Sequence, residues 1–539
     1  MKKETTIFFL IVLMNLIAGI PLFFDFFSTQ GNFTSSGFFL LISAFTSMLL
    51  LAYFFLKHKK IPVAIITILL IWTAVLSFYI TDYPNVISFL TSKDFYKNRV
   101  WNFYHYYIGS KYFDELGYFD LYACTFKADQ EGSNYFFDIT STRDLYTYEL
   151  IQVSQTHCPK EKFSEARWEM FKKDISYLQP QANISYWAGI LSDRGYNPTP
   201  FWNSIGSFLS NSIPLENVIL IKLLMSFDLI LLLLTFGVVL YSFGSITTLA
   251  LIIYSLIFFG NMERLVGGFL EFDWFSAILL SLGFIRLKKE KLSALFLAYA
   301  SVARIFPFFL FFGFLIHSLY KIFVKKKIIR KQFIKTFLLC CIIFFFIGSL
   351  SQRGLGAWKE SYDNLTLHAY HHIDGDRRLG FKHLFTQDFS QTSWQEIVSP
   401  GLLINYEKNK ILYISMLIFL VPLWLSILLK RTSEQASILG YWGVFILLIL
   451  SRYYYLSFAI MLLLLKSEKN AFRYITHVLF LWGLLINYYA NSQNYSLYYL
   501  YFQSNLFLLL YFTVIGISYS WDDWGKKLGG KVIAKLKTS

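Results

Sequence analysis

The sequence predicts an all-α polytopic membrane protein of about 12 to 14 transmembrane helices with a mainly helical extracytoplasmic domain. Of its 539 residues, 55% are hydrophobic and only 15% are charged. A soluble chain of this length would be far less apolar. The apolar residues fall into runs that can cross a bilayer. The basic residues, which give a net charge of +15, gather in alternate turns between these runs.

The apolar runs follow one another from the first residues to the C-terminal tail. A helix needs roughly 17 to 25 residues to cross the hydrocarbon core, so several of these runs are short for a full span. The first has no small-residue cleavage site after it and is predicted to be a retained helix. The runs are Thr6–Phe24, Gly37–Leu56, Ile61–Ile80, Asn217–Tyr241, Ile246–Gly260, Trp274–Ile285, Leu292–Ala303, Phe306–Leu319, Phe333–Leu350, Ile411–Leu429, Ala436–Leu450, Leu456–Leu465, Phe472–Tyr489 and Leu500–Ser518.

The charge distribution predicts the orientation of the chain. Seven turns carry a net charge of +20 together, whereas the long segment 82–216 holds 12 basic and 16 acidic residues. Basic residues mark cytoplasmic loops, so both termini are predicted to be cytoplasmic and the basic clusters to contact anionic lipids. Nucleic acid is not an expected partner. The basic turns are Met1–Glu4, Lys57–Lys60, Arg286–Lys291, Lys321–Lys335, Lys430–Glu434, Lys466–Arg473 and Asp522–Ser539.

The chain is predicted to have six parts. In order, they are N-terminal transmembrane helices (1–81), a large extracytoplasmic loop domain (82–216), a transmembrane core (217–350) with an outer loop at 261–274 and a hairpin around Arg304, a second extracytoplasmic loop (351–410), C-terminal transmembrane helices (411–521) and a basic cytoplasmic tail (522–539).

Within the segment 82–216, two stretches show helical patterns. Tyr104–Leu116 mixes aromatic and polar residues, and Ser164–Leu178 repeats apolar residues at helical spacing after Ser164, a plausible N-cap. Pro180 and the turn Gly195–Pro198 should break the chain before it returns to the membrane. Cys124 and Cys158 also lie in this segment and could form a disulfide on the oxidising side of the membrane.

Two arginines at outer helix ends are candidates for binding a lipid-linked phosphate, because a guanidinium can hold phosphate oxygens in a bidentate fork. Arg304 lies between two half-length apolar runs. The alternative to phosphate binding is that Arg304 forms an ion pair with Asp228 or Glu271. Arg452 precedes three tyrosines, and a role at the membrane interface is the favoured alternative for it.

The stretch from His368 to Arg378 contains three histidines and two aspartates. Imidazole and carboxylate ligands suit a divalent metal, but the spacing matches no defined metal motif. A solvated polar loop is therefore favoured over a metal site, and no cofactor is firmly predicted.

Short motifs carry a family resemblance. They are Tyr106–Tyr118 with Leu121-Tyr122, Arg143–Leu145, Gly195–Pro200, Gly267–Leu270 with Asp273-Trp274, and Arg304–Pro307. In this order the chain resembles bacterial GT-C glycosyltransferases over roughly residues 82–455, more specifically the polyprenyl-phosphate-mannose-dependent enzymes and their uncharacterised relatives. The resemblance implies a GT-C-like fold and a membrane hexosyltransferase, such as a mannosyltransferase, of the bacterial cytoplasmic (inner) membrane with an extracytoplasmic active face.

The resemblance also implies a lipid-linked sugar donor, inverting transfer to an envelope glycan, lipid or protein, and a catalytic carboxylate just before the aromatic helix near Tyr104. Asn102 stands nearest to that place, and an amide cannot act as a general base. Asp94 or His105 is the first substitute for the base; the others are Glu115 and Asp120. The donor phosphate is assigned to Arg304 and Arg452. The predicted substrate-binding residues are Tyr106, Tyr107, Lys111 and Asp273.

Other functions remain open on the sequence alone. A related enzyme could transfer a whole oligosaccharide from a diphosphate carrier. A transporter or flippase of lipid-linked saccharides would have similar spans and buried charges, although it predicts an internal repeat, which is not found. Asn102 also fits a catalytically inactive GT-C relative that acts as a scaffold.

Overall fold

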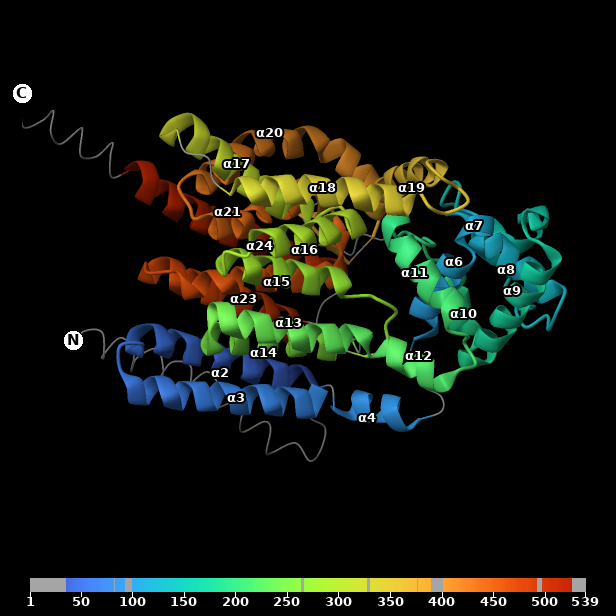
Figure 1. The fold of residues 1–539 in the computed structure, drawn as a ribbon, viewed down its shortest axis with the longest axis horizontal. Helices are drawn as coiled ribbons and strands as arrows, with labels where there is room; N and C mark the ends of the chain where they lie inside the picture. The colour runs from blue at the N-terminus through green and yellow to red at the C-terminus, as the bar shows by residue number, and fades with distance from the viewer. Residues whose placement is uncertain are drawn as a thin grey trace, which may run out of the picture.

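The computed structural model describes residues 35–81, 83–92, 99–262, 266–326, 330–375, 377–388, 401–491 and 497–525. The chain is a membrane-embedded, multi-pass, all-α protein. Its helices form an elongated bundle, and a smaller, mostly helical domain stands at one end of that bundle (Figure 1). We call the smaller part, residues 99–216, the head domain.

The bundle contains long apolar helices that run roughly along the long axis of the molecule (Figure 1). Six stretches in the described part of the chain are long and apolar enough to cross a membrane: Gly37–Leu56, Lys60–Tyr79, Val218–Phe243, Lys331–Gly348, Gly401–Leu429 and Tyr498–Asp523. Three shorter apolar helices accompany them, at Ser245–Phe258, Phe308–Val324 and Ala471–Asn487. Every backbone polar group is satisfied within such a helix, which is what a hydrocarbon environment demands.

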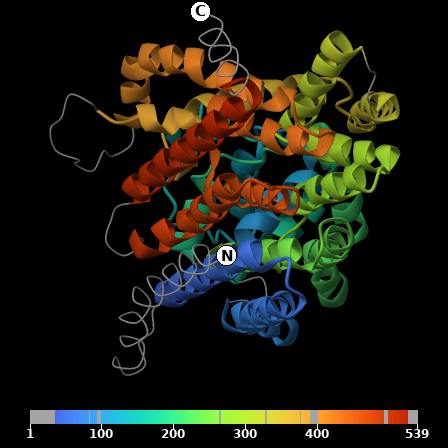
Figure 2. The same cartoon turned by 90° about the vertical axis from the view of Figure 1, so that its left-hand side faces the viewer.

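The bundle elements are α2 (Ser35–Leu56), α3 (Lys60–Thr81), α12 (Val218–Met225), α13 (Phe227–Phe243), α14 (Ser245–Met262), α15 (Asp273–Arg286), α16 (Glu290–Ala303), α17 (Phe308–Lys325), α18 (Lys331–Gly348), α20 (Gly401–Leu429), α21 (Ser433–Gly440), α22 (Trp442–Leu447), the 3₁₀ helix η6 (Arg452–Lys466), α23 (Ala471–Asn491), α24 (Leu497–Ser520) and the π-helix η7 (Trp521–Gly525). Viewed from the end opposite the head domain, α2 packs on α23, while α3 lies against α2 and α14 (Figure 2).

The head domain is preceded by α4 (Tyr83–Thr91) and contains mainly short helices. They are α5 (Val100–Asn102), the π-helix η1 (Phe103–Ile108), α6 (Gly109–Lys111), α7 (Phe113–Leu116), α8 (Leu121–Gln130), α9 (Glu165–Leu178), α10 (Ile184–Leu191) and α11 (Pro200–Ser212), with the short 3₁₀ turns η2 (Val153–Gln155), η3 (Lys160–Lys162) and η4 (Gln179–Gln181). β1 (Ser141–Arg143) and β2 (Leu150–Gln152) form an antiparallel ladder with Thr142 opposite Ile151.

The segment after α18 covers one side of the head domain. It contains α19 (Gly356–His372), β3 (Arg378–Leu379) and the 3₁₀ helix η5 (Phe381–Phe385). β3 pairs antiparallel with β4 (Leu450–Ser451), with Arg378 opposite Ser451, so this segment is tied to the start of η6.

Aromatic side chains dominate the head-domain core. Tyr104, Tyr112, Trp187 and Trp202 are each fully buried there. The same core takes in Phe269 from the connection between α14 and α15. Because a large aromatic ring buries much apolar surface, this shared core fixes the head domain against the bundle.

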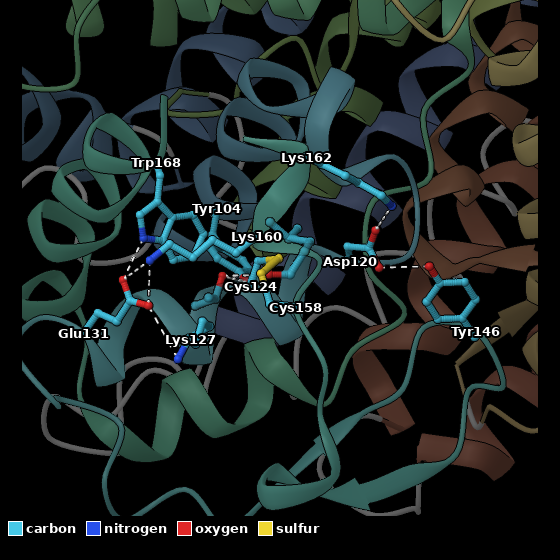
Figure 3. The surroundings of a disulfide bond; sticks show 12 residues. Tyr104, Asp120, Cys124, Lys127, Glu131, Tyr146, Cys158, Lys160, Lys162 and Trp168 are labelled. Atoms are coloured by element: carbon cyan, nitrogen blue, oxygen red, sulfur yellow. Dashed lines mark hydrogen bonds and ion pairs between the residues drawn. A yellow bond between two sulfur atoms is a disulfide. The ribbon is translucent and has the colours of Figure 1, made fainter. Parts of the chain in front are cut away.

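Cys124 and Cys158 form a disulfide, which joins α8 to the loop before η3 (Figure 3). Beside it, the carboxylate of Glu131 accepts hydrogen bonds from Lys160 at 2.8 Å and from the indole of Trp168 at 2.8 Å. Ser164 caps α9, and its side chain accepts a hydrogen bond from the backbone N–H of Arg167 at 3.3 Å. The possible disulfide and the predicted cap are therefore both present.

Several expected elements differ in the structure. The run Ala436–Leu450 is divided into α21 and α22, and Leu456–Leu465 belongs to a 3₁₀ helix rather than an α-helix. α20 begins at Gly401, inside the expected second loop. The polar stretch that begins at His368 was expected to be a loop, but it continues α19 up to His372. That expectation was wrong because polar composition does not exclude a helix that packs on another domain.

Candidate functional site

The candidate site lies where the head domain meets the bundle, and Asn102 is its first member. Asn102 ends α5, directly before the π-helix η1. Its Oδ1 accepts a hydrogen bond from the backbone N–H of Phe269 at 2.7 Å, and its Nδ2 donates to Oε2 of Glu271 at 3.4 Å. π-Helical segments occur often at functional sites, because the wider turn redirects side chains.

The turn that faces Asn102 joins α14 to α15. Gly267 has φ +95°, and a side chain there would also collide with Arg99. A Cβ added at Gly268 would lie 3.1 Å from Oε2 of Glu271 and 3.5 Å from Oδ2 of Asp228. Oδ2 of Asp228 accepts the backbone N–H of Glu271 at 2.7 Å. The two carboxylates therefore converge on this glycine turn.

Asp273 supplies a third carboxylate. It is the first residue of α15 and is only 2% exposed. Its Oδ2 accepts a hydrogen bond from the hydroxyl of Tyr299 at 2.5 Å, and its Oδ1 accepts the N–H of Trp274 at 2.8 Å. Asp228 interacts electrostatically with both Asp273 and Glu271. Three acidic side chains in one place need positive charge nearby.

Arg304 supplies that positive charge from the end of α16. Its guanidinium carbon lies 5.7 Å from the ring centroid of Tyr106 and 5.7 Å from that of Trp202. It interacts electrostatically with Asp273. In the described part of the chain it forms no ion pair, and its buried Nε has no hydrogen-bond partner. The alternative of an ion pair with Asp228 or Glu271 is thus not what the structure shows.

Arg452 is the first residue of η6. Two residues further on, Tyr454 packs against Phe306, with ring centroids 4.6 Å apart, and interacts electrostatically with Arg304. The rings of Tyr453 and Tyr454 are tilted against each other, with centroids 4.3 Å apart. The start of η6, where Arg452 lies, is therefore connected to Arg304 through this aromatic cluster.

His105 does not point into this site with an available nitrogen. Its Nδ1 is 3.0 Å from the backbone oxygen of Trp101, and its Nε2 is 2.7 Å from the hydroxyl of Tyr122. Burial lowers the pKa of His105 below its usual value, although Asp193 and the bond to Trp101 oppose that shift. The geometry describes a neutral core histidine that connects η1 to α8.

The other carboxylate candidates are held in ion pairs away from the glycine turn. Glu115 pairs with Arg167 at 2.6 Å. Asp120 pairs with Lys162 at 2.8 Å and accepts a hydrogen bond from Tyr146 at 2.9 Å (Figure 3). These contacts give both carboxylates a structural partner within the head domain.

Lys111 and Tyr107, expected to bind substrate, also have partners inside the head domain. Lys111 forms a buried ion pair with Asp174 at 2.7 Å. The hydroxyl of Tyr107 donates to the backbone oxygen of Ser210 at 2.9 Å and also contacts that of Ile213. Tyr106 differs from both because its ring is part of the Arg304 site.

Two further predictions concern Asp94 and a metal site. Asp94 lies outside the described residues. Among the described residues, no group of three histidine, cysteine, aspartate or glutamate side chains is arranged to hold a metal ion. Within the stretch that begins at His368, the structure brings His368 and His372 together, with ring centroids 4.8 Å apart.

The structure adds Glu271 and Arg99 to the site. The sequence indicated Glu271 only as a possible ion-pair partner of Arg304, and Arg99 gave no signal beyond its place before an aromatic helix. Their position near Gly267 and Gly268 depends on the packing of the head domain against the bundle. A search against family descriptions, curated proteins and solved structures found no match to the chain.

Proposed function

We propose that the protein is a membrane glycosyltransferase that transfers a sugar from a polyprenyl-phosphate donor to an acceptor of the cell envelope. The observation that carries the proposal is the guanidinium of Arg304, which has no ion-pair partner in the described part of the chain and lies between aromatic rings where the bundle meets the head domain. A lipid phosphate at the membrane boundary is a suitable partner for such a group.

In the proposed reaction, Arg304 binds the phosphate of the donor. The bond between the sugar C1 and the phosphate oxygen breaks, and the oxygen leaves with the electron pair as polyprenyl phosphate. Arg304 stabilises this developing negative charge, which lowers the barrier. The acceptor hydroxyl oxygen forms the new bond to C1 from the opposite face, so that the configuration is inverted.

A carboxylate must take the proton of the acceptor hydroxyl. We assign this role to Glu271, because the connection that carries it also carries Asp273, which interacts electrostatically with Arg304. Glu271 is half-buried at the glycine turn, where the amide of Asn102 orients it. Asn102 would then be a positioning residue rather than the base, which explains an amide at that place.

The ring of Tyr106 supports the same assignment. It packs edge-on against Trp202, with centroids 5.5 Å apart, and lies beside Arg304. Aromatic rings commonly face the apolar side of a sugar, so a ring next to the phosphate-binding group suits a glycosyl phosphate. We propose, as part of the same function, the sugar donor, the acceptor and an outward orientation of the head domain.

The test is transfer of a radiolabelled sugar from polyprenyl-phosphate donors in membranes that contain the full chain. Arg304→Gln and Glu271→Gln should each reduce kcat by about 100-fold or more. Lys173→Gln is the matched control, because Lys173 pairs with Glu216 on the exposed surface of the head domain. Transfer undiminished in Arg304→Gln would overturn the donor site.

A transporter of lipid-linked saccharides remains the competing function. Reconstituted protein that moves the donor across vesicles without forming a new glycosidic bond would favour the transporter and exclude the transferase. An inactive relative would bind polyprenyl phosphate and transfer no sugar from any donor.

A further inference from the structure

A second basic cluster lies on the head-domain side of the molecule, where α19, the loop 193–199, β3 and β4 meet. Its members are Arg194, His368, His372 and Arg378. The imidazoles of His368 and His372 stand one helical turn apart on α19, with centroids 4.8 Å apart. Nε2 of His372 is 3.3 Å from Oγ of Ser451.

Two guanidinium groups flank these imidazoles. Nη2 of Arg194 donates to the backbone oxygen of His371 at 2.8 Å, and Nε of Arg378 donates to that of His372 at 2.7 Å. Both guanidinium groups interact electrostatically with His368 and with His372. Arg194 and Arg378 are thus anchored on the end of one helix.

The cluster contains buried polar atoms without a hydrogen-bond partner. Nε of Arg194, which is a donor, and Nδ1 of His372, which donates or accepts according to the tautomer, are both buried and have no partner in the described part of the chain. His372 as a whole is only 4% exposed. Leaving such groups unsatisfied is costly, so a native structure that retains them points to a ligand that satisfies them.

The charge of Arg194 is not balanced by a close carboxylate in the described part of the chain. Arg194 forms no ion pair among the described residues and has Arg143 as a further positive neighbour. Asp193 and Asp374 act on Arg194 only at longer range, and Asp193 accepts the indole N–H of Trp101 at 2.9 Å. An anion with several oxygens would satisfy both the charge of Arg194 and its unused N–H.

The cluster continues toward the Arg304 site. Ser451, which contacts His372, is followed directly by Arg452 and then by the Tyr453–Tyr454 pair that lies near Arg304. An anion in the cluster would therefore lie along the same chain segment as the proposed donor phosphate.

We propose that Arg194, His368, His372 and Arg378 bind an anionic group, a phosphate or a carboxylate, of the acceptor. This inference rests on the proposed function. The acceptor reaches the site from the head-domain side, and a charged group held here would orient it toward Glu271 and the donor. The substrate class follows from this: an anionic envelope glycan or lipid rather than a neutral one.

The first experiment titrates inorganic phosphate into the purified full-length protein and measures binding by calorimetry. The Arg304→Gln background removes the donor site, so the phosphate binding that remains belongs to the cluster. Adding Arg194→Gln to that background should weaken binding by about 10- to 100-fold. Arg194→Lys, which keeps the charge, should retain part of it, and Lys173→Gln should leave it unchanged.

The outcomes separate this inference from the proposed function. If Arg304→Gln abolishes all phosphate binding and Arg194→Gln changes none, the cluster inference is wrong and the donor site stands. If Arg194→Gln removes binding that Arg304→Gln leaves intact, the cluster stands even when transfer assays overturn the donor site. The melting temperature of each variant without phosphate shows whether it is folded. If Arg194→Gln does not fold, His372→Asn serves as the second variant.

A second arm identifies the source of the anion. Inorganic phosphate should bind when the protein is already saturated with farnesyl phosphate, because acceptor and donor occupy different sites. The cluster would instead belong to a diphosphate carrier if Arg194→Gln weakens binding of farnesyl diphosphate but not of farnesyl phosphate, and if inorganic phosphate competes with farnesyl diphosphate. That result would overturn the assignment to the acceptor.

Discussion

The side-chain amide of Asn102 joins two segments of the chain, because its Nδ2 donates to Oε2 of Glu271 at 3.4 Å while its Oδ1 accepts the N–H of Phe269. The first residues of the aromatic helix are thereby held against the glycine turn between α14 and α15. A carboxylate at position 102 would face Glu271 with a like charge, whereas an amide can accept from the backbone and donate to the carboxylate at once.

Asn102 is therefore predicted to position Glu271. Asn102→Ala should destabilise the protein by about 1 to 3 kcal/mol, because the buried N–H of Phe269 loses its acceptor. Asn102→Asp keeps that acceptor but puts a like charge where Nδ2 donated to Glu271, so kcat should fall while the KM for the donor stays unchanged. The check is kcat and KM for sugar transfer, measured beside the melting temperature of each variant. An unchanged kcat in Asn102→Asp would contradict a positioning role.

Lys111 gives a prediction that separates structural and substrate-binding roles. It forms an ion pair with Asp174 in which both side chains are at most 6% exposed, and Asp174 also accepts the hydroxyl of Tyr112 at 2.7 Å. Lys111→Met should cost about 3 to 5 kcal/mol of unfolding free energy, because it leaves a buried carboxylate uncompensated. Thermal unfolding measures this, and Lys173→Gln, at an exposed pair, is the control. Full stability with lost transfer would instead favour a substrate role.

The disulfide is predicted to stabilise the head domain. Cys124 and Cys158 are 34 residues apart in the sequence. Removal of a native disulfide typically lowers the free energy of unfolding by about 2 to 5 kcal/mol. Cys124→Ser with Cys158→Ser should lower the melting temperature of the full chain. Mass spectrometry of alkylated peptides with and without reduction tests the bond itself. Labelling of both cysteines before reduction would show that the bond is absent.

Local sequence signals predicted part of this structure, and long-range packing decided the rest. Ser164 as a helix cap depends on its immediate neighbours and was predicted correctly. Arg304 was placed between two apolar runs, as the structure confirms. The contact of Asn102 with Glu271 spans 169 residues of sequence, and no local pattern contains it. The same holds for the pairing of Lys111 with Asp174 and of His105 with Tyr122, since polar residues in a sequence do not show which of them a fold will pair.

His368 is expected to make the fold sensitive to acid. Burial, reinforced by Arg194 and Arg378, lowers the pKa of His368 to about 3. An unfolded histidine has a pKa near 6.5, so between about pH 6.5 and 3 the unfolded chain binds more protons than the folded one. The stability should therefore be fully present above about pH 6.5 and be lost progressively as the pH falls toward 3.

His368→Asn removes this titration and keeps a polar side chain of similar size. The unfolding free energies of wild type and variant should differ by a constant amount above pH 7, and at pH 5 the wild type should have lost up to about 2 kcal/mol more than the variant. Thermal unfolding from pH 7.5 to 4.5 in phosphate-free buffer measures this. Parallel pH profiles for the two proteins would mean that His368 is protonated at its ordinary pKa in the fold, which would require the imidazole to be far better solvated than its position between Arg194 and Arg378 permits.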